Sequence, residues 1–234
     1  MSTIPMIEEL ASALGDFREQ FVLVGGAVLE LLITDPAVID FRPTTDVDLV
    51  VEAATYGTYS SVEQTLSDRG FAHMVGPGIP ICRWRIGTVV ADIMPTEESV
   101  LGFGNRWYPD VVRSAQLHAL PSGKEIRRIA PEFFIATKLD AFRTRGNGDA
   151  RLSYDMEDII AVLDGRAGID YEILASTLSV KSYIAEEFQK LSRDTDFQDA
   201  VQGYLCTATD SVARRRIVLE RIASITQEHT GDAK

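Results

Sequence analysis

The sequence has few residues suited to soft-metal binding or disulfide formation, since its 234 residues include only two cysteines and three histidines. Cys82 and Cys206 lie far apart and fit no metal-binding or redox spacing, so we expect two reduced, buried thiols in a cytoplasmic protein. No apolar run is long enough to cross a bilayer, and we expect no membrane partner. The opening MSTIPMIEEL lacks a basic region followed by an apolar stretch, so we expect no signal peptide.

Basic side chains are also in short supply. Lysine and arginine together number 23 against 35 aspartates and glutamates, which gives a formal net charge of −12. A chain this acidic is not a general nucleic-acid binder, although a local basic surface stays compatible with it. Its 45% hydrophobic and 25% charged residues are ordinary for a globular protein, and its length allows one large domain or a core with an appended lobe.

The first half of the chain alternates predicted strands and helices. Hydrophobic spacing predicts helices at 4–14, 27–33 and 58–68, strands at 21–24 and 45–52, and hairpins joining 81–86 to 89–94 and 115–120 to 125–129. Residues 95–109 are predicted as an unusually long connection, of the kind that is often functional. Within it Trp107 fits base stacking and core packing about equally.

From residue 131 onward the pattern changes to helices, six of which are predicted between 131 and 226. Pro131 suits the first turn of a helix and Gly165 suits the end of one. We therefore expect a mixed α/β domain over residues 1–130 and a helical domain over residues 131–234.

Two carboxylates stand close together in the predicted strand 45–52, TDVDLVVE. Asp46 and Asp48 are two positions apart, so their side chains point to the same face of the strand. Adjacent carboxylates repel each other unless a cation lies between them, and Mg²⁺ prefers such oxygen ligands. Most Asp pairs at this spacing are solvated, but the apolar neighbours here indicate a buried strand, where unpaired aspartate is rare.

A third carboxylate, Asp92, lies in the apolar segment VVADIMP. If the strand that carries it pairs with strand 45–52, the three acids meet. Three carboxylates of this kind can hold two metal ions about 3.5–4 Å apart for in-line phosphoryl displacement. We therefore predict a metal site formed by Asp46, Asp48 and Asp92.

Gly25 and Gly26 follow the predicted strand 21–24 and precede a helix. Glycine lets backbone N–H groups approach a phosphate, and the amino end of a helix adds partial positive charge. A Gly-Gly pair alone is usually a tight turn. Its position, one helix and one loop before the paired aspartates, favours phosphate binding.

The order of these parts resembles the DNA-polymerase-beta-type nucleotidyltransferase superfamily. VGG at 24–26, RPTTDVD at 42–48 and ADIM at 91–94 are similar to its AbiEii-type group, which includes toxins of bacterial toxin–antitoxin and abortive-infection systems. That group also has a helix with a conspicuous lysine, here FIATKLDAFRTRG, and an Asp-x-x-Asp motif, here in SYDMEDIIAVL. The resemblance covers residues 21–165 and implies an α/β (α+β) fold, a mixed sheet flanked by helices with a C-terminal helical lobe.

The resemblance implies Mg²⁺-dependent transfer of a nucleoside monophosphate from an NTP to an acceptor. Asp46 and Asp48 would hold metal and triphosphate, and Asp92 would complete the site and help to deprotonate the acceptor hydroxyl. Lys138 would act as a point charge toward the triphosphate. The implied nucleotide-binding residues are Gly25, Gly26, Arg42, Thr44, Asp155 and Asp158.

The chain departs from the family pattern at two positions. Ala27 follows Gly26 where the superfamily often has serine, and Tyr154 precedes the Asp-x-x-Asp motif where a basic residue is common. The first change removes a hydroxyl contact to phosphate. The second leaves open a structural role for Asp158, which would then face Lys138 across two helices.

Three functions stay open at this point. The first is transfer to a macromolecule such as the tRNA 3′ end, with a cognate antitoxin as partner. The second is modification of a small molecule such as an antibiotic hydroxyl, which the charge of −12 mildly favours, because a cationic acceptor would be attracted and tRNA repelled. The third is a catalytically degenerate binding or antitoxin-like protein, against which the three retained acids argue.

Overall fold

The computed structural model describes residues 2–35, 42–145, 148–206, 208 and 210–231. Its contacts divide the chain into two compact units. The first unit comprises Met1–Glu30 and Pro43–Ala130, and the second comprises Leu31–Arg42 and Pro131–Lys234. Residues 31–42 thus group with the helical part. Whether residues 1–130 and 131–234 are separate folding domains stays a prediction.

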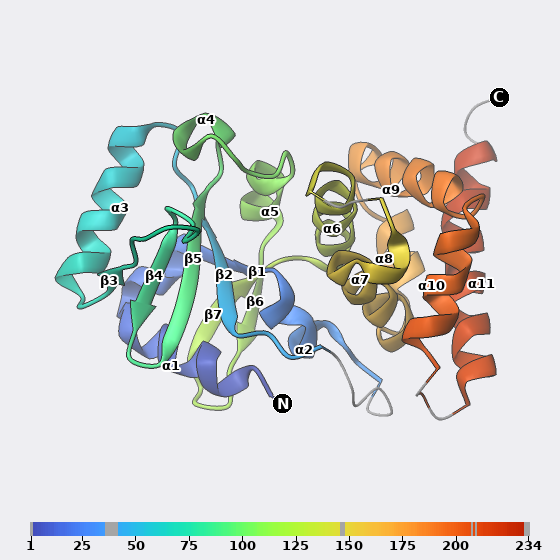
Figure 1. The fold of residues 1–234 in the computed structure, drawn as a ribbon, viewed down its shortest axis with the longest axis horizontal. Helices are drawn as coiled ribbons and strands as arrows, with labels where there is room; N and C mark the ends of the chain where they lie inside the picture. Colours follow the sequence, from blue (N-terminus) through green and yellow to red (C-terminus); the bar gives the residue numbers. More distant parts are fainter. Residues whose placement is uncertain (1, 36–41, 146–147, 207, 209, 232–234) are drawn as a thin grey trace. The chain divides into compact units, whose positions relative to one another are not determined.

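A seven-stranded mixed sheet forms the centre of the first unit within the described residues (Figure 1). Its strand order is β3-β4-β5-β2-β1-β7-β6. The central strands β2 and β5 run parallel, as do β1 and β7, whereas the other neighbours are antiparallel. The strands are β1 (Phe21–Val24), β2 (Asp46–Val51), β3 (Ala72–His73), β4 (Arg83–Ile86), β5 (Val89–Pro95), β6 (Gln116–Ala119) and β7 (Glu125–Arg128).

Helix α1 (Ile4–Leu14) covers one face of this sheet. Its buried residues Ile7 and Leu10 line a small apolar cavity together with Leu23 of β1 and Leu49 of β2. Successive strand residues point to opposite faces, so the side chains of Asp46 and Asp48 emerge on the face away from α1. The face that carries these aspartates, here called the polar face, also bears buried valines of β1 and β2.

The remaining helices of the first unit are α2 (Leu29–Leu32), which crosses into the second unit, α3 (Tyr56–Asp68), α4 (Glu98–Leu101) and α5 (Tyr108–Ser114), with 3-10 turns at Gly15–Gln20 and Gly26–Val28. Helix α3 begins at a capping box made by Thr55 and Thr58. Its Tyr59 hydroxyl donates a hydrogen bond of 2.6 Å to the carbonyl of Ile93 and so ties the helix to β5.

The prediction of a long connection over residues 95–109 was wrong. This segment contains α4, which ends at Gly102 with φ +79°, and the start of α5, which has Pro109 in its first turn. Helices this short present too few turns to show a periodic pattern. Trp107 is 6% exposed, so the core-packing alternative is confirmed for this side chain.

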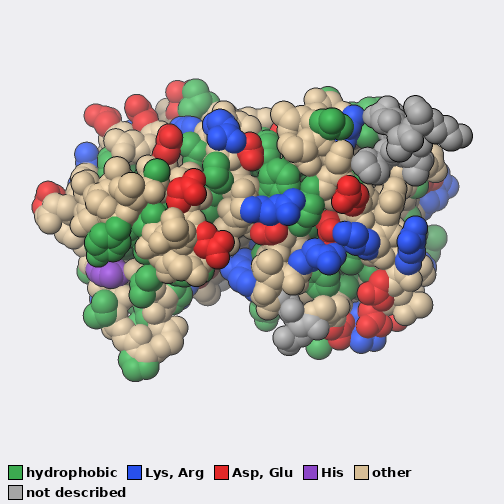
Figure 2. Space-filling view, turned by 90° about the horizontal axis from the view of Figure 1, so that it is seen from above, with side chains coloured by type: hydrophobic (Ala, Val, Ile, Leu, Met, Phe, Trp, Pro, Cys, Tyr) green, Lys and Arg blue, Asp and Glu red, His purple; other side chains and the backbone are tan. Residues whose placement is uncertain are grey.

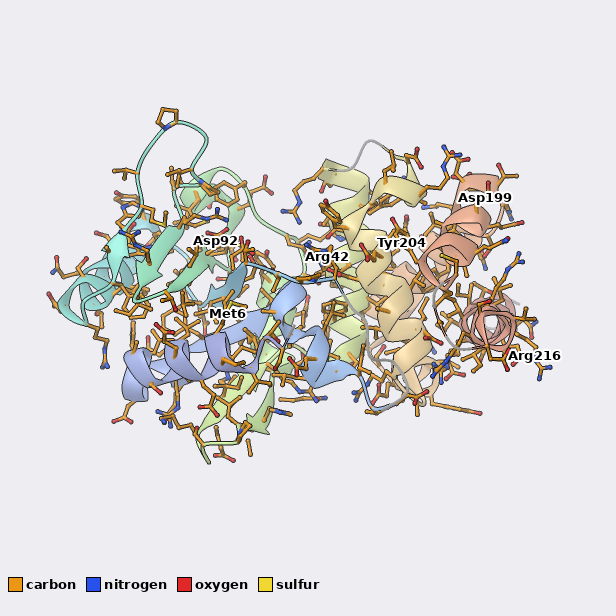
Figure 3. All side chains as sticks on the ribbon, turned by 60° about the horizontal axis from the view of Figure 1, so that its bottom comes forward. Met6, Arg42, Asp92, Asp199, Tyr204 and Arg216 are labelled. Carbon is orange, nitrogen blue, oxygen red and sulfur yellow. The ribbon has the colours of Figure 1, made fainter. Side chains whose placement is uncertain are left out.

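The second unit is helical throughout the described residues. It consists of α6 (Pro131–Arg145), a 3-10 turn at Ala150–Leu152, α7 (Tyr154–Gly165), α8 (Ile169–Leu174), α9 (Leu178–Leu191), α10 (Thr195–Tyr204) and α11 (Ser211–Gly231). Helix α11 bears Arg216, which projects into solvent (Figure 3) and pairs with Glu220 of the same helix at 2.9 Å. No helix in the described part of the chain has the length and apolarity needed to cross a membrane.

One cysteine does not lie where the sequence predicts. Cys82 is buried, as expected, but Cys206 is exposed, and neither forms a disulfide. Cys206 lies two residues beyond the end of α10, in the segment before α11. The expectation of two buried thiols is therefore wrong for Cys206.

Candidate active site

Three strands bring two aspartates and an arginine into one row on the polar face of the sheet. Asp48 on β2 lies opposite Asp92 on β5, and Asp92 lies opposite Arg83 on β4. Residues directly opposite on neighbouring strands are about 5 Å apart and point to the same face. Asp46 is two positions from Asp48 and faces the same way. We refer to Asp46, Asp48 and Asp92 as the acidic cluster; Asp92 is labelled in Figure 3.

The Gly25 backbone closes one side of the acidic cluster. Gly25 has φ +66°, and a Cβ at this position would overlap a carboxylate oxygen of Asp48. Any side chain here would therefore displace Asp48 as well as strain the backbone. Gly26 is the first residue of the 3-10 turn that follows, and it is buried. The Gly-Gly turn thus holds bare backbone against the Asp48 carboxylate.

Arg83 bridges the other two acids of the cluster. Its Nε donates to Asp92 Oδ1 at 2.8 Å, and its Nη2 donates to Asp92 Oδ2 at 2.7 Å and to Asp46 Oδ2 at 2.8 Å. The hydrogen bond to Asp92 raises the pKa of Arg83, against the opposing effect of burial. The guanidinium is therefore a permanent cation between the two carboxylates.

Thr44 supplies the remaining contact to Asp46. Its hydroxyl donates to Asp46 Oδ1 at 3.0 Å. All four carboxylate oxygens of Asp46 and Asp92 thus accept hydrogen bonds from Thr44 or Arg83. Thr44, predicted as a nucleotide-binding residue, here orients a carboxylate.

The donor set of the acidic cluster fits a hard divalent cation. It offers carboxylate oxygens from adjacent strands, and the guanidinium between Asp46 and Asp92 marks a place where a cationic group is accepted. As the side chains stand, no three acidic, histidine or cysteine residues of the described part of the chain converge as metal ligands. Metal binding would therefore require Arg83 to give up carboxylate oxygens.

Cys82 lies beside the cluster, next to Arg83. Burial, followed by the charges of Asp92 and Asp48, raises the pKa of this thiol to about 12. The group is thus neutral at physiological pH and is no nucleophile there.

A second charged group lies within the helical unit, between α6 and α7. Lys138 Nζ is 2.6 Å from Asp158 Oδ2 and 3.0 Å from Asp155 Oδ1. Burial lowers the pKa of Lys138, but the two carboxylates outweigh it and the pKa is raised. Asp158 is only 1% exposed. The structural alternative for Asp158, that it faces Lys138 across two helices, is confirmed.

Arg42 joins this second group. Its guanidinium lies 3.8 Å from Asp158 Oδ2 and 4.5 Å from the ring centre of Tyr154. The aromatic ring of Tyr154 thus gives the guanidinium a cation–π partner. Tyr204 of α10, labelled with Arg42 in Figure 3, donates to the Arg151 carbonyl at 2.9 Å, beside the start of α7.

The predicted site residues thus fall into two groups, one in each unit. Asp46, Asp48, Asp92, Gly25, Gly26 and Thr44 lie in the first unit, and Arg42, Lys138, Asp155 and Asp158 lie in the second. Sequence reasoning missed Arg83. The predicted hairpin about residues 87–88 contained its signal, since that register places Arg83 opposite Asp92.

Comparisons with solved structures show a distant likeness of fold. No protein-family model and no curated protein sequence matches the chain. The structure is similar to the crystal structure of a candidate nucleotidyltransferase from H. pylori, with a TM-score of 0.49 and 12% sequence identity, over 99% of this chain and 96% of that one.

Proposed function

We propose that the chain is a Mg²⁺-dependent nucleotidyltransferase that moves a nucleoside monophosphate from an NTP to an acceptor. The observation that supports this most is the row of Asp48 and Asp92 on adjacent parallel strands, with Asp46 on the same face. Carboxylates held side by side repel one another, and a bound divalent ion relieves that repulsion. When bound, the metal would polarise the phosphate oxygens and stabilise charge at the leaving pyrophosphate.

The chain's own residues would supply positioning and proton transfer. Asp46 and Asp48 would orient the triphosphate through the metal, and Asp92 would accept the proton of the acceptor hydroxyl. The bare backbone of Gly25 and Gly26 would admit a phosphate close to Asp48. Each role uses a group that already lies on the polar face of the sheet.

Lys138 would have a more conditional role. As a point charge it would neutralise the triphosphate, but its ammonium is already paired with Asp155 and Asp158. Nucleotide binding through Lys138 would therefore need it to leave one of these carboxylates. The same condition applies to the proposed nucleotide-binding residues Arg42, Asp155 and Asp158, which would each have to give up a present ion-pair contact.

The proposed acceptor is a macromolecule of the tRNA 3′-end type, acting within a toxin–antitoxin or abortive-infection system. A small cationic acceptor is the second candidate, because the net charge of −12 attracts cations and repels RNA. Acidic and basic side chains are interspersed on the face drawn in Figure 2, so a local basic surface is compatible with the overall charge. The two candidates differ in which acceptor takes up label.

The experiment incubates the protein with each of four α-labelled NTPs, Mg²⁺, and either total tRNA or a panel of aminoglycoside-type acceptors. We expect label to move to one acceptor class in the presence of Mg²⁺ and to stay in the NTP when EDTA is added. Label on RNA supports the first candidate, and label on a small molecule supports the second.

The control variants follow from the contacts of each residue. Asp48→Asn keeps the side-chain shape against Gly25 and removes the charge, whereas Lys138→Ala would also break the link between α6 and α7. Asp48→Asn is thus the cleaner test of chemistry. If Asp48→Asn transfers label at the wild-type rate, the assignment of the acidic cluster as the active site is wrong. If the protein binds no NTP, the alternative of a catalytically degenerate binding protein is favoured.

A further inference from the structure

Arg83 holds the oxygen atoms that a metal ion would need. Both oxygens of Asp92 and one oxygen of Asp46 accept hydrogen bonds from its guanidinium, at 2.7–2.8 Å. A bidentate arginine–carboxylate pair is among the stronger polar contacts in proteins. The guanidinium and a divalent ion therefore compete for the same ligands.

The main chain around Arg83 is fixed, whereas its side chain has room to move. Arg83 pairs with Asp92 in the β4–β5 register, and the adjoining Trp84 is 2% exposed and stacks on His73 at 4.6 Å. The Arg83 side chain itself is 26% exposed. Its guanidinium can thus leave the carboxylates without any change in the sheet.

We propose that Arg83 is an internal counter-ion that occupies the acidic cluster in the absence of metal and must be displaced when a divalent ion binds. This inference rests on the proposed function. Competition from Arg83 lowers the affinity of the acidic cluster for metal in the free chain. Arrival of the triphosphate then favours metal binding, because its negative charge attracts both the metal and the released guanidinium. Arg83 is then a regulating residue of the metal site.

The test is a titration of nucleotide-free protein with Mn²⁺. Binding is measured by calorimetry and by the loss of the electron paramagnetic resonance signal of free Mn²⁺. We expect Arg83→Gln to bind Mn²⁺ about tenfold or more tightly than the wild type, because a competing positive charge within a few ångströms is removed. Arg83→Lys keeps the charge but loses the fork and should lie between the two.

Arg85 provides the matched control. It lies two residues along the same strand, in one row with Asp46 across β5, and is exposed, so Arg85→Gln removes the same charge from a solvated side chain on the same face. We expect it to leave Mn²⁺ affinity within about twofold of wild type, since exposed charges at a distance are screened. Tryptophan fluorescence on each variant checks that the first unit is folded before titration.

The outcomes separate this inference from the proposed function. Tighter Mn²⁺ binding by Arg83→Gln alone supports the counter-ion role. Equal affinity in the wild type and Arg83→Gln, or an equal gain in Arg85→Gln, overturns it and leaves the metal site intact. Absence of Mn²⁺ binding in every folded variant overturns the metal site itself, and with it the proposed chemistry.

Discussion

At the scale of single residues, the candidate site is defined by the partner of each carboxylate oxygen. Thr44 and Arg83 engage all four oxygens of Asp46 and Asp92, and Asp48 lies against the bare backbone of Gly25. A charged carboxylate that is largely removed from water needs such partners. Arg83 is therefore a shared cationic partner of Asp46 and Asp92.

The first prediction concerns the two thiols. At pH 8 a disulfide reagent such as DTNB should modify one thiol per native chain within minutes, because Cys206 is exposed whereas the pKa of Cys82 is about 12. Both should react in denaturant. Cys206→Ser should abolish the fast reaction, and rapid labelling of that variant would show that Cys82 is accessible.

The second prediction uses Gly25. Gly25 has φ +66° and ψ −160°, a conformation essentially restricted to glycine. Gly25→Ala should therefore cost about 1–3 kcal/mol from backbone strain alone, and more because the new Cβ also meets the Asp48 side chain. The measurement is denaturant unfolding followed by tryptophan fluorescence. Gly123→Ala is the control, since Gly123 has φ +82° and a methyl group there would meet open space. Equal losses in the two variants would contradict the close approach to Asp48.

At the scale of helices, Lys138 joins α6 to α7. Its ammonium lies between Asp155 and Asp158 at 3.0 and 2.6 Å, in a largely buried position. Removal of one partner from a buried ion pair leaves an uncompensated charge, whereas replacement of both by apolar groups is often neutral. The stability of the helical unit should therefore depend on the pair and not on either residue alone.

The third prediction is a double-mutant cycle. Lys138→Met should cost about 3–5 kcal/mol of unfolding free energy, and Lys138→Met with Asp158→Leu should recover most of it. The pKa of Lys138 is raised above 10.5 in the folded protein. The ion pair therefore contributes fully to the free energy of unfolding at pH 7, and this contribution is lost as the pH rises through the folded-state pKa. Chemical unfolding at pH 7 and pH 11 measures both effects. Additive losses in the double variant would exclude the coupling.

The sequence predicted most elements and less of their assembly. Regular periodicity located α1 at residues 4–14 and β1 at residues 21–24 as the structure has them, but α4 is a single turn and left no such signal. The pairing of β2 with β5 joins strands that are separated along the chain by α3, β3 and β4, so no local pattern specifies it. Arg83 was missed because one arginine forms no motif by itself, and its place opposite Asp92 shows only when the register of the predicted hairpin is written out.

At the scale of the whole chain, the two compact units carry different optical signals. Both tryptophans, Trp84 and Trp107, are buried in the first unit, while the second unit is helical throughout its described residues. Fluorescence therefore reports on the sheet, and circular dichroism at 222 nm weights the helical unit. A ligand that binds only the native first unit should stabilise that unit by mass action.

The fourth prediction follows from this separation. If residues 1–130 and 131–234 fold as domains, the two probes should give non-coincident unfolding transitions, and Mg²⁺ with NTP should raise the fluorescence midpoint. Saturation at about 100 times the dissociation constant would add about 2.7 kcal/mol. Coincident transitions that shift together would instead indicate a single cooperative unit.

If the acidic cluster performs metal-dependent nucleotidyl transfer, the protein should release pyrophosphate from NTP in the presence of Mg²⁺ and acceptor, and this release can be measured. We predict that Asp48→Asn slows release by about 100-fold or more, since loss of a metal ligand costs several kcal/mol in the transition state. Asp68→Asn, at an exposed position on α3, should match the wild type. Equal rates in the wild type and Asp48→Asn would contradict this role of the acidic cluster.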